Sequence, residues 1–156
     1  MRFPPVTGSS LQRKKVNLPQ DLKGERNLVL IAFQQWQQGQ VDTWIPFAQQ
    51  LEATYPEVRY YELPTIQRLN VLARTFINEG MRAGIPDPLA RERTVTLYLD
   101  KSEFREALQL PGEDEISVLL LGRQGKVLWR ASGAFSPEKA ESLAAVIGGG
   151  QHGEDE

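Results

Sequence analysis

The sequence contains no cysteine, and its 156 residues include a single histidine. A chain without cysteine forms no disulfide and has no thiolate nucleophile, iron–sulfur ligand or thiolate zinc site. The histidine, His152, lies in the C-terminal stretch GGGQHGEDE, which we expect to be flexible. These absences exclude thiol redox chemistry and leave almost no basis for histidine-dependent acid–base catalysis or metal binding.

Long apolar runs and an excess of one charge are also missing. The longest apolar run covers residues 28–33, whereas a helix needs about 20 apolar residues to span a bilayer. The N-terminal MRFPPVTG lacks the apolar core of a secretory signal, and its prolines interrupt the helix of a transit peptide. A net charge of −2 gives no electrostatic basis for nucleic-acid binding. We expect a soluble intracellular protein, cytoplasmic or organellar, with at most peripheral membrane contact.

The composition, 40% hydrophobic and 24% charged, is that of one globular domain. We expect an extended N-terminal segment over residues 1–26, a folded domain over residues 27–147 and a flexible tail over residues 148–156. The first segment carries six basic side chains against two acidic ones. This pattern suits a solvated strand, or an arm that contacts anionic lipid or a partner.

Strand and helix patterns alternate along the chain. Residues 27–33, NLVLIAF, are apolar throughout, as in a strand that is covered on both faces. Further strand patterns cover residues 58–66, 94–99, 116–122 and 126–132, and helix patterns fall within residues 42–55, 68–84, 101–110 and 137–147. The last two strands are joined by a tight turn and so must be antiparallel. The order predicts an α/β fold with a mixed sheet and helices on both faces.

Glycine, proline and capping residues indicate where the helices begin and end. We expect Gly39 to break the chain after the first strand and Asp42 to cap the helix that follows. Pro46 then lies in the first turn of that helix or kinks it. Asp100 and Glu103 have the spacing of a capping box for the helix at residues 101–110.

The three tryptophans differ in their surroundings. Trp44 shares a helical face with other apolar residues, which favours core packing. Trp129 shares a strand face with Val127, which favours packing on the sheet. Trp36 belongs to no periodic face, so it is either an exposed anchor for a partner or an incidental loop residue.

Five glutamines lie between Phe33 and Val41, where the first strand turns into a helix. Glutamine is not a nucleophile, but it donates and accepts hydrogen bonds. The turn is therefore a binding site at a helix N-terminus or an inert polar loop. A second polar group comprises Asp42, Glu113, Asp114 and Glu115. These acids would bind a cation if they converged in one pocket, and otherwise form solvated loops.

The pattern resembles the thioredoxin fold, in its peroxiredoxin-like branch. Phe33 and Pro46 match the strand end and helix proline of thioredoxins, but the redox-motif positions read Gln38, Gly39, Gln40 and Val41. Ser117 stands near the position of the family's cis-proline. The resemblance implies a thioredoxin-like scaffold without its redox sulfurs, in which neither motif position is able to exchange electrons.

Two longer stretches resemble the thioredoxin-like assembly factors of the mitochondrial ATP synthase, which are chaperones of its membrane a subunit. The stretches are QVDTWIPFAQQLEATY and EISVLLLGRQGKVLWRASGAFSPEKAESL, and the similarity runs over about residues 8–147. It implies a non-catalytic binding or chaperone protein with a protein client, such as a membrane subunit of an F-type ATP synthase, and no cofactor.

The expected client-binding residues are Trp36, Gln38, Gln40 and Ser117, which the thioredoxin topology brings to one cleft. Two alternatives stay open. One is an enzyme or small-ligand binder that uses carboxylates and a metal. The other is a structural protein whose cleft is packed shut by Trp36 and Trp44.

Overall fold

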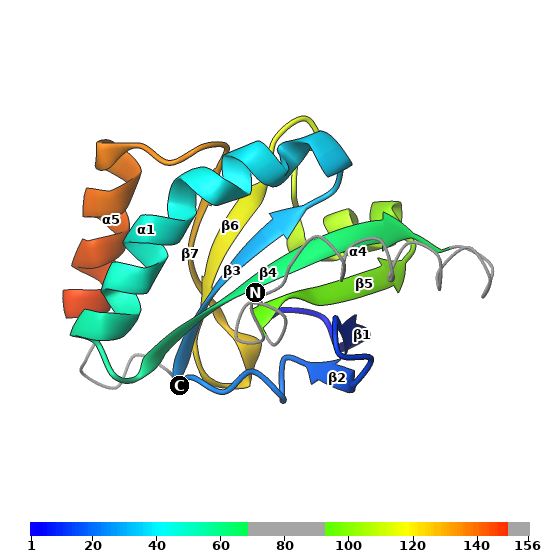
Figure 1. Cartoon of the computed structure of the whole chain (residues 1–156), viewed down its shortest axis with the longest axis horizontal. Coiled ribbons are helices and arrows are strands. Elements are labelled where there is room, and N and C mark those ends of the chain that lie inside the picture. The colour runs from blue at the N-terminus through cyan, green and yellow to red at the C-terminus, as the bar shows by residue number, and fades with distance from the viewer. Residues whose placement is uncertain (69–92, 150–156) are drawn as a thin grey trace.

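A computed structural model describes residues 1–68 and 93–149 and contains one seven-stranded sheet in the order β2-β1-β5-β4-β3-β6-β7 (Figure 1). The strands are β1 (Val6–Ser10), β2 (Lys15–Leu18), β3 (Arg26–Ala32), β4 (Val58–Gln67), β5 (Val95–Leu99), β6 (Ser117–Leu121) and β7 (Val127–Ser132). The helices are the 3-10 turns η1 (Gln35–Gln37) and η2 (Arg123–Gly125) and the α-helices α1 (Gln38–Thr54), α4 (Lys101–Leu108) and α5 (Pro137–Gly149).

The sheet is mixed, as the sequence predicts. Strands β3, β4 and β5 are parallel to one another, whereas β6 and β7 form an antiparallel hairpin beside β3. At the other edge β1 and β2 pair antiparallel and attach to β5. The N-terminal segment therefore joins the sheet, although its division from the rest at residue 26 stays a prediction.

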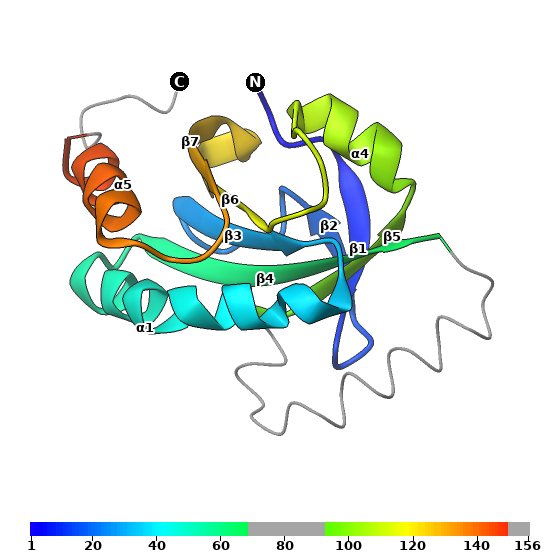
Figure 2. The same cartoon turned by 90° about the horizontal axis from the view of Figure 1, so that it is seen from above.

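The apolar run of β3 places it at the centre of the molecule. Its side chains alternate between two buried clusters, with Val29 and Ile31 in one and Leu28 and Leu30 in the other. Helices α1 and α5 cover the second cluster, and α4 lies across the sheet on the first (Figure 2). Helices on both faces explain why β3 carries no polar side chain between Leu28 and Ala32.

Trp44 fills the centre of the cluster beneath α1. Its side chain is fully buried and its Nε1 donates to the carbonyl oxygen of Gly133 at 3.0 Å. The ring contacts Phe135 and Trp129 edge-on, with centroids 5.4 and 6.3 Å away. Gly133 has φ of +82°, a backbone conformation that favours glycine. The prediction of core packing for Trp44 is thus confirmed.

The expected alternation along β7 is wrong at one point. A register shift lies between Leu120 and Leu121, so that Leu120 pairs with Trp129 and Leu121 pairs with Val127. Leu128 is the extra residue of this bulge. As a result Val127 packs against the first cluster and Trp129 against the second, on opposite faces of the sheet.

The start of α1 also differs from the expectation. The helix begins at Gln38, so Gly39 lies within its first turn and does not break the chain. Asp42 is inside the helix and accepts a hydrogen bond from Gln38 Nε2 at 2.9 Å, and the prediction that it caps the helix is wrong. Pro46 is consequently an interior residue of α1, where it supplies no N–H to the preceding turn.

The later helices begin as the sequence indicates. Asp100 is the N-cap of α4 and accepts a hydrogen bond from Glu103 N at 3.1 Å. Ser136 Oγ accepts from Lys139 N at 3.2 Å at the start of α5. The helix expected over residues 68–84 falls, apart from its first residue, outside the described residues.

Trp44→Phe is expected to lower the free energy of unfolding by about 2–3 kcal/mol, because it removes a buried hydrogen bond and leaves a cavity. Urea unfolding followed by circular dichroism measures the change. Trp36→Phe serves as the matched control and should change stability by less than about 0.5 kcal/mol. Equal effects of the two substitutions would contradict the assignment of Trp44 as the packing centre.

Candidate functional site

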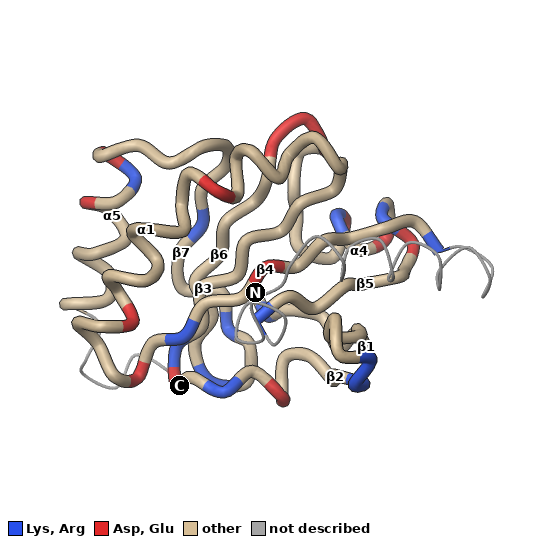
Figure 3. The backbone as a smooth tube through the Cα atoms, viewed as in Figure 1, with Lys and Arg blue, Asp and Glu red and all other residues tan. Residues whose placement is uncertain are grey.

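The candidate site lies where β3 ends and α1 begins. Turn η1 connects the two. Residues 38–41, which stand at the positions of the thioredoxin redox motif, form the first turn of α1. The acidic loop over residues 113–115 lies before β6 and is coloured red in Figure 3. The start of β6 pairs with the end of β3, so this loop and η1 lie at the same end of these two strands.

The side chain of Gln37 connects the end of β3 to the loop before β6. Its side chain has no exposed surface, and its Oε1 accepts hydrogen bonds from Phe33 N at 2.8 Å and Gln34 N at 3.2 Å. Its Nε2 donates to the carbonyl oxygen of Glu113 at 2.5 Å. One buried amide thus joins the end of β3 to a loop that is 76 residues later in the chain.

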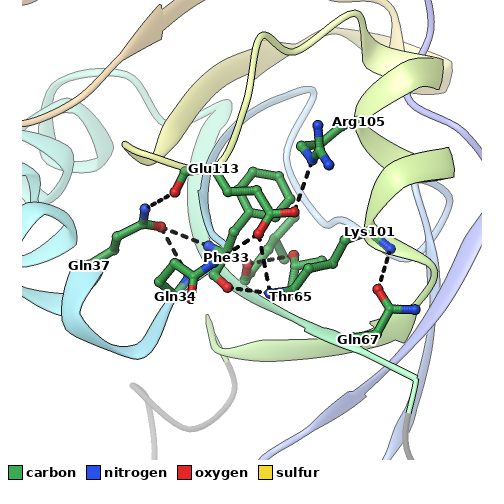
Figure 4. Close-up of polar contacts among 9 residues, drawn as sticks. Phe33, Gln34, Gln37, Thr65, Gln67, Lys101, Arg105 and Glu113 are labelled. Atoms are coloured by element: carbon green, nitrogen blue, oxygen red, sulfur yellow. Dashed lines mark hydrogen bonds and ion pairs between the residues drawn. The ribbon is translucent and has the colours of Figure 1, made fainter.

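The Glu113 carboxylate is held by three donors (Figure 4). Gln34 Nε2 and Arg105 Nε donate to it at 2.9 and 3.0 Å, and Lys101 Nζ lies 3.5 Å from it. Lys101 Nζ also donates to the carbonyl oxygen of Phe33 at 2.6 Å. Glu113 is therefore a paired structural acid that ties α4 to η1.

Gln40 makes a second contact with the loop that precedes β6. Its Oε1 accepts a hydrogen bond from Ile116 N at 3.0 Å. A glutamine amide carries the same donor and acceptor groups as a peptide unit. Gln37 and Gln40 therefore occupy backbone groups of residues 113–116 that an added strand would otherwise use.

The four expected client-binding residues lie at different depths. Trp36 is 62% exposed, and Gln38 is also exposed. Gln40 is half-buried, and Ser117 is only 3% exposed. Their role in binding stays a prediction. A cleft packed shut by both Trp36 and Trp44 does not agree with the exposure of Trp36.

The four candidate acids do not converge. Glu113 is paired with Arg105 and Lys101, whereas Asp42 accepts from Gln38. Asp114 and Glu115 are exposed on their loop. In the described part of the chain no group of three or more histidine, aspartate or glutamate side chains is placed to hold a metal ion.

Glu62 on β4 is a site residue that the sequence did not indicate. Gln38 Nε2 donates to Glu62 Oε1 at 3.3 Å and to Asp42 at 2.9 Å, so one amide bridges two carboxylates. Burial raises the pKa of Glu62 above its ordinary value, the hydrogen bond from Gln38 opposes this shift, and the charge of Asp42 adds to it.

Comparison with known proteins identifies the family. The family model described as ATP10 protein matches residues 1–149. The chain belongs to the ATP10 protein family. This is a family of ATP synthase assembly factors. The resemblance to such factors that the sequence indicated is thus confirmed. A search of curated proteins finds no match.

Solved structures similar to this ATP10-family chain share its thioredoxin-like fold. A thiol:disulfide interchange protein from Bacteroides sp. is 16% identical, with TM-score 0.63, over 97% of this chain and 91% of that one. BsSco, of the Sco family of cytochrome c oxidase assembly proteins, is 19% identical, with TM-score 0.61, over 94% and 92%. The lipoprotein thioredoxin Etrx1 from Streptococcus pneumoniae is 11% identical, with TM-score 0.58, over 93% and 99%.

The fold and the composition of the chain differ in what they share with these proteins. The thioredoxin-like fold is confirmed, but the chain has no cysteine with which to perform thiol exchange. Across residues 1–68 and 93–149, every helix is too short or too polar to cross a membrane.

Gln37→Glu should destabilise the ATP10-family chain by about 2–3 kcal/mol at pH 7, because a buried carboxylate cannot donate to the Glu113 carbonyl oxygen. Burial raises the folded-state pKa of the introduced carboxyl, so the loss grows as pH rises through that pKa and shrinks at lower pH. Urea unfolding at pH 5 and pH 7 measures both values relative to wild type. Gln35→Glu, in the same turn but exposed, is the control; a pH-independent loss at position 37 would refute the role of this amide.

Glu62→Gln should raise stability at pH 8. The folded-state pKa of Glu62 lies above its unfolded value, so wild type loses stability as pH rises through the folded pKa, and the amide removes this loss. Below about pH 4 the two proteins should be equally stable. Thermal unfolding at pH 4 and pH 8 tests this, with the exposed substitution Glu106→Gln as control. A variant less stable than wild type at pH 8 would show that the Glu62 carboxylate is stabilising.

Proposed function

We propose that this chain is a non-catalytic chaperone that holds an extended segment of a membrane subunit of an F-type ATP synthase at the former redox cleft. The observation that carries the proposal is the 62% exposure of Trp36 at the head of α1. Tryptophan is favoured as an anchor in protein interfaces.

The neighbouring groups suit the recognition of a polypeptide. No acidic residue lies in the first turn of α1 and no side chain caps it, so the positive end of the helix dipole faces the site. The amide oxygen of the exposed Gln38 is able to accept from a client N–H, while its nitrogen donates to Asp42 and Glu62. Gln40 and Ser117 are the further client contacts that we propose.

The proposed mode of client binding follows from hydrogen bonds that the backbone before β6 already makes. Gln37 and Gln40 already bond the carbonyl of Glu113 and the N–H of Ile116. Strand β6 already pairs with β3 and β7, and a client that pairs with residues 113–116, just before β6, has to compete with these amides. We therefore place the main client contact at Trp36, where no such competition arises.

The family role sets the proposed location and partner. The ATP10 family acts in ATP synthase assembly in mitochondria, so we propose an organellar location for this chain. Its client is a membrane protein, and we propose that the chain meets that client at the membrane surface through peripheral contact.

Trp36→Ala should reduce recovery of the membrane subunit roughly tenfold or more in pull-downs from native membrane extracts, because truncation of an interface tryptophan costs at least about 2 kcal/mol. Gln35→Ala, exposed in the same turn, should leave recovery unchanged. Mass spectrometry of the recovered proteins measures the effect. Equal recovery with the two variants, or no ATP synthase component with wild type, would count against the proposed function.

A further inference from the structure

A basic hollow lies at the end of the sheet opposite to Trp36. It has a volume of about 300 Å³ and opens between the β1–β2 turn and the amino ends of β4 and β5. Basic residues colour the β1–β2 turn blue in Figure 3. The hollow is lined by Ser10, Gln12, Lys14, Lys15, Val16, Asp21, Lys23, Arg59, Tyr61, Arg93 and Val95.

Four of the five cations that line the hollow keep donor groups for a ligand. Within the described residues, the ammonium groups of Lys14, Lys15 and Lys23 form no ion pair. Arg59 Nη1 donates to the carbonyl oxygens of Pro56 and Val58 at 2.8 and 2.9 Å, which leaves its other nitrogens. The hollow therefore carries a concentrated positive charge in a chain whose net charge is −2.

The remaining charged groups of the hollow are already engaged. Arg93 pairs with Glu52 and stacks on the ring of Tyr60, with its guanidinium carbon 4.3 Å from the ring centroid. The carboxylate of Asp21, the acidic residue of the lining, accepts from Asn17 N at 2.7 Å. This hydrogen bond stabilises the chain after β2, and within the described residues the carboxylate forms no ion pair with the lysines.

A fixed hydroxyl group accompanies the lysines. Tyr61 is largely buried, and its oxygen accepts a hydrogen bond from Lys23 N at 3.0 Å, so its proton remains for a ligand oxygen. Burial raises the pKa of Tyr61, which keeps this proton in place at neutral pH. Ser10 Oγ accepts from Gln12 N and Lys14 N and thereby shapes the turn that carries Lys14 and Lys15.

We propose that this hollow binds a phosphate group, presented either by a lipid headgroup or by a soluble phosphate compound. Lysine ammonium groups bind phosphate as point charges, and a hydroxyl donor adds a directed hydrogen bond. The cationic lining excludes a metal ion. Its two valines offer too little apolar surface to anchor a peptide by hydrophobic contact.

This site is separate from the proposed client site. The residue paired with Arg59 on β3 is Asn27, and β3 continues for five residues to Ala32 before η1 begins. Five residues of strand span about 16 Å. A phosphate ligand in the hollow therefore leaves Trp36 uncovered, and the proposal stands or fails independently of client binding.

Two binding measurements on the full chain test the proposal. Pyrophosphate is titrated against the protein by isothermal calorimetry, and co-sedimentation is measured with phosphatidylcholine vesicles that contain phosphatidic acid. Lys14→Gln/Lys15→Gln should weaken binding roughly tenfold to thirtyfold, since each lysine near an anionic surface contributes about a factor of five. Binding of pyrophosphate assigns a soluble source, and binding of vesicles alone assigns a lipid headgroup.

Two further variants separate a built site from general surface charge. Arg2→Gln/Arg68→Gln removes the same charge elsewhere and should leave binding within about twofold of wild type. Tyr61→Phe changes no charge at neutral pH and should weaken binding severalfold. The proposal is overturned if neither probe binds, if the control variant loses as much affinity as the lysine variant, or if Tyr61→Phe has no effect.

Discussion

The buried amide of Gln37 is the constraint on which the candidate site depends. It accepts from two backbone N–H groups after β3 and donates to a carbonyl just before β6. Glu113, whose carbonyl it binds, receives Gln34 and two cations of α4 through its side chain. The strand end, the head of α1, the acidic loop and α4 are therefore held in one hydrogen-bonded unit, and Trp36 is presented from a rigid base.

The thioredoxin-like scaffold explains both what the chain retains and what it has lost. A central strand leads into a helix head on one edge of the sheet, the place where related folds carry their reactive sulfurs. Here the two cysteine positions are Gln38 and Val41, and the nearby Gln37 and Gln40 form hydrogen bonds to the backbone before β6. The ATP10 family is one of assembly factors, and a helix head surrounded by amides is consistent with a protein that binds without chemical change.

Much of this fold could be predicted from the sequence, because apolar runs, capping residues and tight turns act over short distances. The alternation of strands and helices, the β6–β7 hairpin and the Asp100 cap follow from such local signals. The start of α1 could not, since its first turn is held by contacts to β4 and to the loop before β6. Gln37 likewise gave no signal, because its partner lies 76 residues away. The bulge opposite Leu120 has no marker such as a glycine in β7.

The carbonyl of Glu113 and the N–H of Ile116 already form hydrogen bonds within the chain, and this affects how readily a bound polypeptide is released. A polypeptide that pairs with these groups exchanges one set of hydrogen bonds for another, so the net gain from hydrogen bonding is close to zero. Retention of the polypeptide then depends on side-chain burial. The side chains of Gln37 and Gln40 re-form their hydrogen bonds when the polypeptide leaves. Under the proposed function, such an arrangement favours rapid release of the client over permanent capture.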